Sequence, residues 1–141
     1  MTWDVEPQRH LGYLIRRAQQ RHVATWARVA STETTSVQYA ILAVLDRLGE
    51  ASQRELCDEV DLDRSTVADL LARMERRGLV ARHRADGDAR RNVVTLTAAG
   101  LAERQRLAPR VERVQQELAE GMAADEVARL EVGLRALLAR E

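Results

Sequence analysis

Along much of this chain, apolar residues return every three or four positions, which is the spacing of one face of an α-helix. The first such segment places six side chains on one face of a long predicted helix: Leu11, Ile15, Ala18, His22, Trp26 and Val29. The polar segment 31–36 (STETTS) then breaks the pattern. Thr35 or Ser36 can cap a second helix, in which Gln38 completes a capping box with Thr35, and Gly49 ends that helix.

The middle of the chain carries the signals of two shorter helices. The sequence SQRE at 52–55 is a second capping box, which predicts a short helix through Val60. Residues 61–63 then form a turn, and Asp63 can cap a further helix that ends at Gly78. Its inward-facing residues are Val67, Leu70, Leu71 and Met74. Two helices joined by a three-residue turn form a helix-turn-helix, which alone is weak evidence for DNA binding.

A short β-hairpin is predicted directly behind this motif. Residues 79–84 (LVARHR) alternate as a strand does, Asp86-Gly87 is a turn dipeptide, and residues 92–96 (NVVTL) predict the returning strand. Helix, helix, turn, helix and hairpin together make a winged helix-turn-helix. The expected fold class is therefore mainly α with a small β-hairpin wing.

Two more helices are predicted behind the wing. Thr97 can cap a long helix with a stripe of apolar residues: Leu107, Val111, Val114, Leu118 and Met122. The final helix carries Val127, Leu130, Leu134 and Leu137. A monomer would leave much of these stripes and that of the first helix exposed, which favours a homodimer over packing within one chain. We expect one domain over 1–141, with dimerisation helices at 8–30 and 98–140 and a DNA-binding part at 36–97.

Composition narrows the function. The 141 residues are 45% hydrophobic and 31% charged, which excludes global disorder. No apolar run approaches the ~20 residues that span a bilayer, so no membrane partner is expected. Basic and acidic residues balance at 22 each, yet the segment Arg73–Arg91 holds seven Arg against three acids. Any DNA contact must therefore be concentrated there.

The first candidate for DNA contact is the outward face of the helix that Asp63 caps, which is the second helix of the helix-turn-helix. Arg64, Ser65 and Thr66 lie in or near its first turn, and Asp69 and Arg73 follow on the same side. Small hydroxyl residues allow close approach, and Arg can bond guanine bidentately. The alternative is a solvated helix face with ordinary charges.

The wing favours the DNA interpretation. Its polar loop displays Arg90 and Arg91, and a guanidinium at such a tip fits a narrow minor groove. Asp88 could hold Arg90 extended through an ion pair. The candidate DNA-binding residues are Arg64, Ser65, Thr66, Asp69, Arg73, Arg84, Asp88, Arg90 and Arg91.

The sequence DGDARRNVVTLT at 86–97, preceded by DLDRSTVADLLARMERRGLVARHR at 61–84, resembles the MarR family of bacterial winged-helix transcription regulators. That family's signature is Asp-x-Arg in the wing followed by Leu-Thr opening the next helix, which Asp88, Arg90, Leu96 and Thr97 match. The resemblance implies an obligate homodimer on a pseudo-palindromic operator, with recognition helices in successive major grooves. It also implies Arg90 in the minor groove. Because no apolar run is long enough to span a bilayer and residues 1–10 lack a basic start followed by an apolar stretch, we expect a cytoplasmic, nucleoid-associated protein.

The first helix resembles more closely those members that respond to small aromatic carboxylates such as protocatechuate. In them an arginine of an Arg-Arg pair and a histidine six residues later bind the ligand, and Arg16 and His22 match these positions. Trp26 matches an aromatic one turn on, and Tyr13 is a weaker candidate. Six residues along a helix is about 120° out of register, so one ligand reaches both only in a groove around the helix or across the dimer. Alternatively, His22 is a buried seam residue and Arg16 a solvated one.

Other functions find less support. No catalytic constellation, phosphate loop or metal cluster can be assembled, so neither an enzyme nor a cofactor is expected. The single cysteine, Cys57, excludes an internal disulfide framework and is better explained as a small buried hydrophobe than as a redox sensor. The prediction is a ligand-released repressor. The alternatives are a DNA-binding or architectural protein without an effector, and a protein-interaction adaptor.

Overall fold

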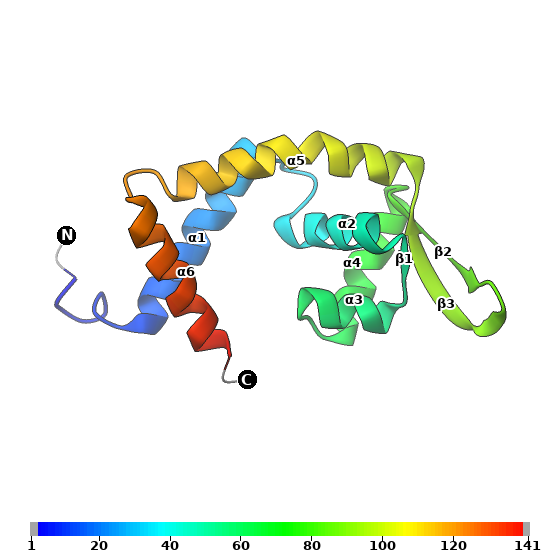
Figure 1. Ribbon diagram of the computed structural model, residues 1–141, viewed down its shortest axis with the longest axis horizontal. Helices are drawn as coiled ribbons and strands as arrows, with labels where there is room; N and C mark the ends of the chain where they lie inside the picture. Colours follow the sequence, from blue (N-terminus) through cyan, green and yellow to red (C-terminus); the bar gives the residue numbers. More distant parts are fainter. Residues whose placement is uncertain (1–2, 140–141) are drawn as a thin grey trace.

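The computed structural model describes residues 3–139, which fold into a helical winged helix-turn-helix with long flanking helices (Figure 1). Its elements in chain order are α1 (Leu11–Val29), α2 (Ser36–Leu48), β1 (Glu50–Ala51), α3 (Gln53–Val60), α4 (Arg64–Arg76), β2 (Val80–Ala85), β3 (Asp88–Leu96), α5 (Ala98–Leu118) and α6 (Ala124–Leu138). The predicted fold class is confirmed.

Helix starts follow the capping signals of the sequence. Thr35 and Gln38 form a complete capping box at α2, and Ser52 and Glu55 form another at α3. The Asp63 carboxylate accepts the backbone N–H of Thr66 at 2.7 Å and so caps α4. These caps satisfy backbone donors that a helix start leaves unpaired, which fixes where each helix of the central motif begins.

The sheet is larger than predicted. It has three antiparallel strands in the order β1-β3-β2, and β1 was not predicted because it consists of two residues, Glu50 and Ala51, paired with Thr95 and Val94. The returning strand was predicted at 92–96 but begins at Asp88. Pairing with β2 jumps from Arg84↔Asn92 to Ala85↔Asp88, so the segment 89–91 has no partner positions in β2. This irregularity lies where the wing carries its arginines.

The core lies under the helix-turn-helix. Its buried residues come from α2, α3, α4 and the sheet, and Leu56, Val67, Leu71 and Met74 are fully buried. The inward face predicted for α4 is confirmed, with Leu70 partly buried at its edge. A second, smaller cluster joins α1 to α5 through Trp26, Ala30 and Val114. The helix-turn-helix therefore has its own core, separate from the contacts between the long helices.

Helix α5 runs along the top of the molecule, from the wing to α6, and connects the two parts (Figure 1). At its start Gly100 approaches the turn after α4 so closely that a Cβ there would lie 1.9 Å from the Leu79 carbonyl oxygen. Pro109 sits inside the helix and provides no backbone N–H to it. The prediction that this helix includes Met122 was wrong: the helix ends at Leu118, and Gly121, with φ +84°, turns the chain.

Candidate DNA interface and effector groove

The outward face of α4 is open to solvent, as predicted. Arg64, Ser65, Thr66, Asp69 and Arg73 are all exposed. The Ser65 hydroxyl donates to the Asp63 carboxylate at 3.0 Å. Bonds from Thr66 lead in lowering the pKa of Asp63, followed by the bond from Ser65, so the carboxylate is ionised at neutral pH. The Asp69 carboxylate and the Arg73 guanidinium are 3.2 Å apart, one helical turn from each other.

The wing arginines differ in their surroundings. The Asp88 carboxylate accepts the backbone N–H of Arg90 at 3.0 Å, so the predicted contact between these residues fixes the backbone of the loop and not the guanidinium. Arg91 points back toward the motif and pairs with Glu55 of α3 at 2.5 Å, which corrects its predicted place at the tip. Arg84 is exposed and stands opposite Asn92. Arg90 and Arg91 both belong to the segment without partner positions in β2, where the register shift breaks the regular pairing of the strands.

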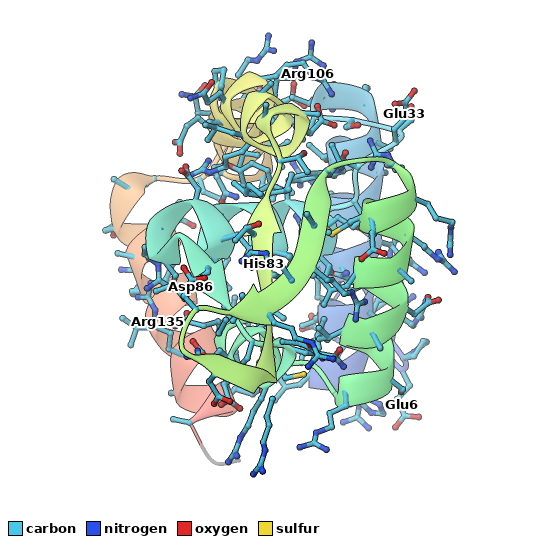
Figure 2. The ribbon with its side chains drawn as sticks, turned by 90° about the vertical axis from the view of Figure 1, so that its right-hand side faces the viewer. Glu6, Glu33, His83, Asp86, Arg106 and Arg135 are labelled. Atoms are coloured by element: carbon cyan, nitrogen blue, oxygen red, sulfur yellow. The ribbon has the colours of Figure 1, made fainter. Side chains whose placement is uncertain are left out.

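Two ion pairs tie the wing to the helices. Arg91 bonds Glu55 on one side, and on the other the Arg82 Nε lies 3.1 Å from a Glu75 oxygen of α4. The pKa of Glu55 is lowered, first by the Ser52 hydroxyl and then by Arg91. Figure 2, viewed from the wing end, shows His83 and Asp86 on the ribbon in front. The wing is therefore held at its base while its tip projects.

An apolar groove lies between α1 and α6 and has a volume of about 710 Å³. We name it the α1/α6 groove; its apolar walls include Leu11, Leu14, Ile15, Leu130, Leu134 and Leu137. All six leucine and isoleucine side chains are at least 38% exposed. Contiguous exposed apolar surface of this kind marks an interaction site. No helix of residues 3–139 has the length and apolar character needed to cross a membrane.

The four predicted effector residues fall into two pairs. The His22 and Trp26 rings meet edge to face at 6.3 Å between centroids, and the Arg16 guanidinium lies 5.3 Å from the centre of the Tyr13 ring. Trp26 is buried, and His22 is half-buried. No recorded contact within residues 3–139 joins Arg16 to His22. The single chain therefore does not assemble the four into one site.

A second groove of about 470 Å³ lies between α1 and α4, and we name it the Trp26 groove. Both helices contribute to its walls: Trp26 comes from α1, and Thr66 and Leu70 come from α4. A further hollow on α1, lined in part by Arg16, shares Gln19, Val23 and Ala27 with it. The two hollows therefore adjoin, although Arg16 lies about 15 Å from Trp26 along the helix axis.

Sequence reasoning missed the polar residues behind this groove. The Trp26 indole N–H donates to the Thr34 carbonyl oxygen at 2.8 Å, and Thr34 is fully buried. The Thr34 hydroxyl in turn lies 2.6 Å from Glu103 of α5. The sequence STETTS marked only a break between helices, and nothing in its pattern singled out the fourth residue of six.

Neither Cys57 nor a group of metal-ligating side chains forms a further candidate site within residues 3–139. Cys57 is half-buried on α3 and packs against the core, as expected for a small apolar residue. Across residues 3–139, no three His, Cys, Asp or Glu side chains gather in a group that could hold a metal ion.

Comparison with known proteins identifies the family. A sequence model described as the MarR family matches residues 33–91. The PcaV transcriptional regulator of Streptomyces coelicolor, solved with its natural ligand, is 39% identical, with a TM-score of 0.89 over 98% of this chain and 97% of that one. The chain belongs to the MarR family. The proteins of this family that it resembles are transcriptional regulators and not enzymes, in agreement with the sequence-based prediction.

Two further MarR-type relatives bear on regulation. The HTH-type transcriptional repressor NicR of Pseudomonas putida is 36% identical over 101 residues, a match that covers 71% of this chain and 63% of NicR. BpsR of Bordetella bronchiseptica, whose structure addresses regulation of DNA binding by 6-hydroxynicotinic acid, is 28% identical with a TM-score of 0.88. That alignment covers 94% of this chain and 96% of BpsR. This MarR protein thus resembles one regulator that was solved with its natural ligand, PcaV, and one whose DNA binding is regulated by an aromatic acid, BpsR.

Proposed function

We propose that this protein is a homodimeric repressor that binds a pseudo-palindromic DNA operator and releases it when a small aromatic carboxylate binds. The observation that carries the proposal is the Trp26 groove, because one hollow has walls from both α1 and α4, which we assign as the recognition helix. A ligand in that hollow contacts both α4, the helix to which we assign the base contacts, and the long N-terminal helix α1. Its binding energy can therefore differ between two orientations of α4, which is the requirement for an allosteric effector.

The DNA contacts we assign follow from exposure and charge. Arg64 and Arg73 on α4 are open to solvent, and the major groove presents guanine acceptors to such side chains. Arg90 is exposed on the projecting wing, where it would enter the adjacent minor groove. We assign Arg91 and Arg84 supporting contacts with phosphate. Arg91 must then exchange Glu55 for a phosphate oxygen or share both.

The proposed dimer rests on the α1/α6 groove. Two copies packed there would cover leucine side chains on α6 such as Leu134, which is 45% exposed, and Leu137, which is 44% exposed. Apolar burial at roughly 25 cal/mol per Å² favours this association. A two-fold dimer also places two recognition helices in one complex, which a palindromic operator requires.

The aromatic acid is assigned to the Trp26 groove and the hollow that adjoins it. The accessible surface of the groove is mostly apolar, although seven of its lining residues are polar, among them Thr35, Ser36 and Thr66. Arg16 would bind the carboxylate bidentately, either by extending from the adjoining hollow or across the interface from the second copy. His22, in contact with Trp26, would bond a ring hydroxyl.

The test begins with a DNA duplex that the wild-type protein selects from a random-sequence pool. Protocatechuate and 6-hydroxynicotinate are then titrated into the complex while fluorescence anisotropy reports release. Arg16→Ala should retain DNA affinity and lose the response, whereas the neighbouring Arg17→Ala, whose guanidinium bonds Gln20 at 3.0 Å, should respond normally. An equal response in both variants would remove Arg16 from the ligand site.

A second comparison separates DNA binding from the alternatives. Arg73→Ala and Arg90→Ala together should abolish sequence-specific binding, since each bidentate contact to a base contributes about 1–3 kcal/mol. Full retention in the double variant would contradict the assigned interface. Wild-type protein that binds DNA specifically but responds to neither acid, nor to benzoate, would favour a regulator without an aromatic effector.

A further inference from the structure

A set of four polar residues, of which one is fully buried, one is half-buried and two are exposed, connects the α1–α2 loop, the end of α4 and the first half of α5. We name it the Thr34 network; its members are Thr34, Arg77, Glu103 and Arg106. Arg77 is the C-cap residue of the recognition helix, and Glu103 lies on α5. Figure 2 shows Arg106, a member of the network, at the same end of the molecule as Glu33, whose backbone oxygen accepts a bond from Arg77.

Thr34 is the centre of this network, and its carbonyl and hydroxyl groups together contact residues of three elements. Its carbonyl oxygen accepts the Trp26 indole N–H at 2.8 Å, and its hydroxyl donates to a Glu103 oxygen at 2.6 Å. The same hydroxyl oxygen accepts from the Arg77 guanidinium at 3.0 Å. One residue with no exposed surface thus joins the wall of the Trp26 groove to the end of α4 and to α5.

Glu103 completes the connection. Its side chain is 10% exposed, and beside the Thr34 bond it lies 3.4 Å from Arg77 and 2.6 Å from Arg106. Burial acts to raise the pKa of Glu103, but bonds from Thr34 and Arg106 and the charges of Arg106 and Arg77 outweigh it, so the pKa lies below its usual value. The carboxylate is therefore charged at neutral pH and holds Arg77 in place.

We propose that Thr34 and Glu103 are positioning residues that transmit effector binding in the Trp26 groove to the recognition helix through Arg77. The inference rests on the proposed function, because it assumes that an aromatic acid binds in that groove. Such a ligand packs against the Trp26 ring and shifts the indole, and with it the Thr34 carbonyl. Breaking the hydrogen bonds of a buried hydroxyl costs free energy, so a shift of Thr34 also moves Arg77. Because Arg77 is the C-cap residue of α4, this movement changes the orientation of that helix.

The chain offers a matched control on the same helix. Glu117 also lies on α5 and also pairs with an arginine, Arg28 of α1. This pair joins α1 to α5 at a point away from α4. If the Thr34 network acted only by holding helices together, loss of either glutamate charge would affect regulation to the same extent.

The experiment measures three quantities for each variant: the Kd for protocatechuate, the Kd for the selected DNA duplex, and the factor by which saturating protocatechuate weakens DNA binding. For the wild type we expect a factor of about 5–150. In Glu103→Gln the two separate Kd values should stay within roughly threefold, while the coupling factor falls toward one. Glu117→Gln should keep the wild-type factor.

Variants at Thr34 give an independent reading if Glu103→Gln folds poorly. Thr34→Val preserves shape and the carbonyl that holds Trp26 but removes the hydroxyl, so it should uncouple the sites. Thr34→Ser keeps the hydroxyl and should retain the factor by which protocatechuate weakens DNA binding. Normal coupling in Thr34→Val, or equal loss in Glu117→Gln, would overturn the proposal. If instead the wild-type protein binds no aromatic acid, it is the proposed function that fails, and this outcome is visible before any variant is made.

Discussion

Replacement of Gly100 by alanine tests how closely α5 must approach the turn that follows α4. Gly100 is the third residue of the helix, and a Cβ built there lies 1.9 Å from the Leu79 carbonyl oxygen and 2.9 Å from its carbon. Ordinary contact begins near 3.4 Å. One of the two backbones must therefore retreat by about 1.5 Å, because neither atom belongs to a flexible side chain.

The expected loss follows from what that movement breaks. Thr97 N–H donates to the Leu79 carbonyl at 3.1 Å, and the Thr97 hydroxyl accepts the Gly100 N–H at 3.0 Å. Weakening this cap costs about 1 kcal/mol, and overpacking costs typically 1–3 kcal/mol. Alanine recovers about 1 kcal/mol of helix propensity. The net destabilisation is about 2 kcal/mol, equivalent to a decrease in Tm of roughly 4–8 °C.

Thermal unfolding followed by far-UV circular dichroism at fixed protein concentration measures this effect. Gly12→Ala is the matched control, since Gly12 lies in α1 and a Cβ there meets nothing within 4 Å. It should be neutral or slightly stabilising. The reasoning fails if Gly100→Ala unfolds at or above the wild-type temperature, because helix propensity would then outweigh the close approach.

Three further predictions concern the assembly, the pH dependence and the wing. Leu134→Glu, in the α1/α6 groove, should yield a monomer by light scattering, whereas Leu101→Glu, which is 38% exposed on α5 outside that groove, should not; a dimeric Leu134→Glu protein would place the interface elsewhere. Because the pKa of Glu103 is lowered on folding, its contribution to stability is present above the unfolded pKa of about 4.3 and disappears as the pH falls through the lower folded value. The difference in unfolding free energy between wild type and Glu103→Gln should therefore narrow on acidification, and a constant difference down to about pH 3 would contradict the assigned charge. Arg91→Ala should cost less than about 1 kcal/mol of stability, because the Arg91 and Glu55 side chains are 46% and 43% exposed; a larger loss in urea denaturation would show that the pair supports the fold.

Local signals in the sequence were sufficient for the helices and for the order of elements. Thr35, Ser52 and Asp63 were recognised as caps because a capping bond joins residues two or three apart, which sequence spacing reveals directly. The turn at Asp86-Gly87 is local in the same sense, with Gly87 at φ +81°. Caps and turns can be predicted from the sequence because each depends only on residues a few positions away.

The features that sequence reasoning missed are set by contacts between distant residues. Strand β1 exists because Glu50 and Ala51 lie beside the end of β3, more than 40 positions later, and two residues carry no periodicity of their own. The Thr34 network likewise joins positions up to 69 residues apart. Arg90 and Arg91 are adjacent and chemically identical, yet only the fold directs one of them back to Glu55.

The length of α5 has a mechanical consequence. Its 21 residues extend over about 32 Å, from the wing to the connection with α6. A rotation of only about 10° around the α6 end sweeps the other end through roughly 5 Å, nearly half the width of a major groove. In a symmetric pair the two displacements add. In the proposed dimer, a ligand would therefore need to rotate each α5 only slightly to change the distance between the two helix-turn-helix units so that they no longer match successive major grooves of DNA.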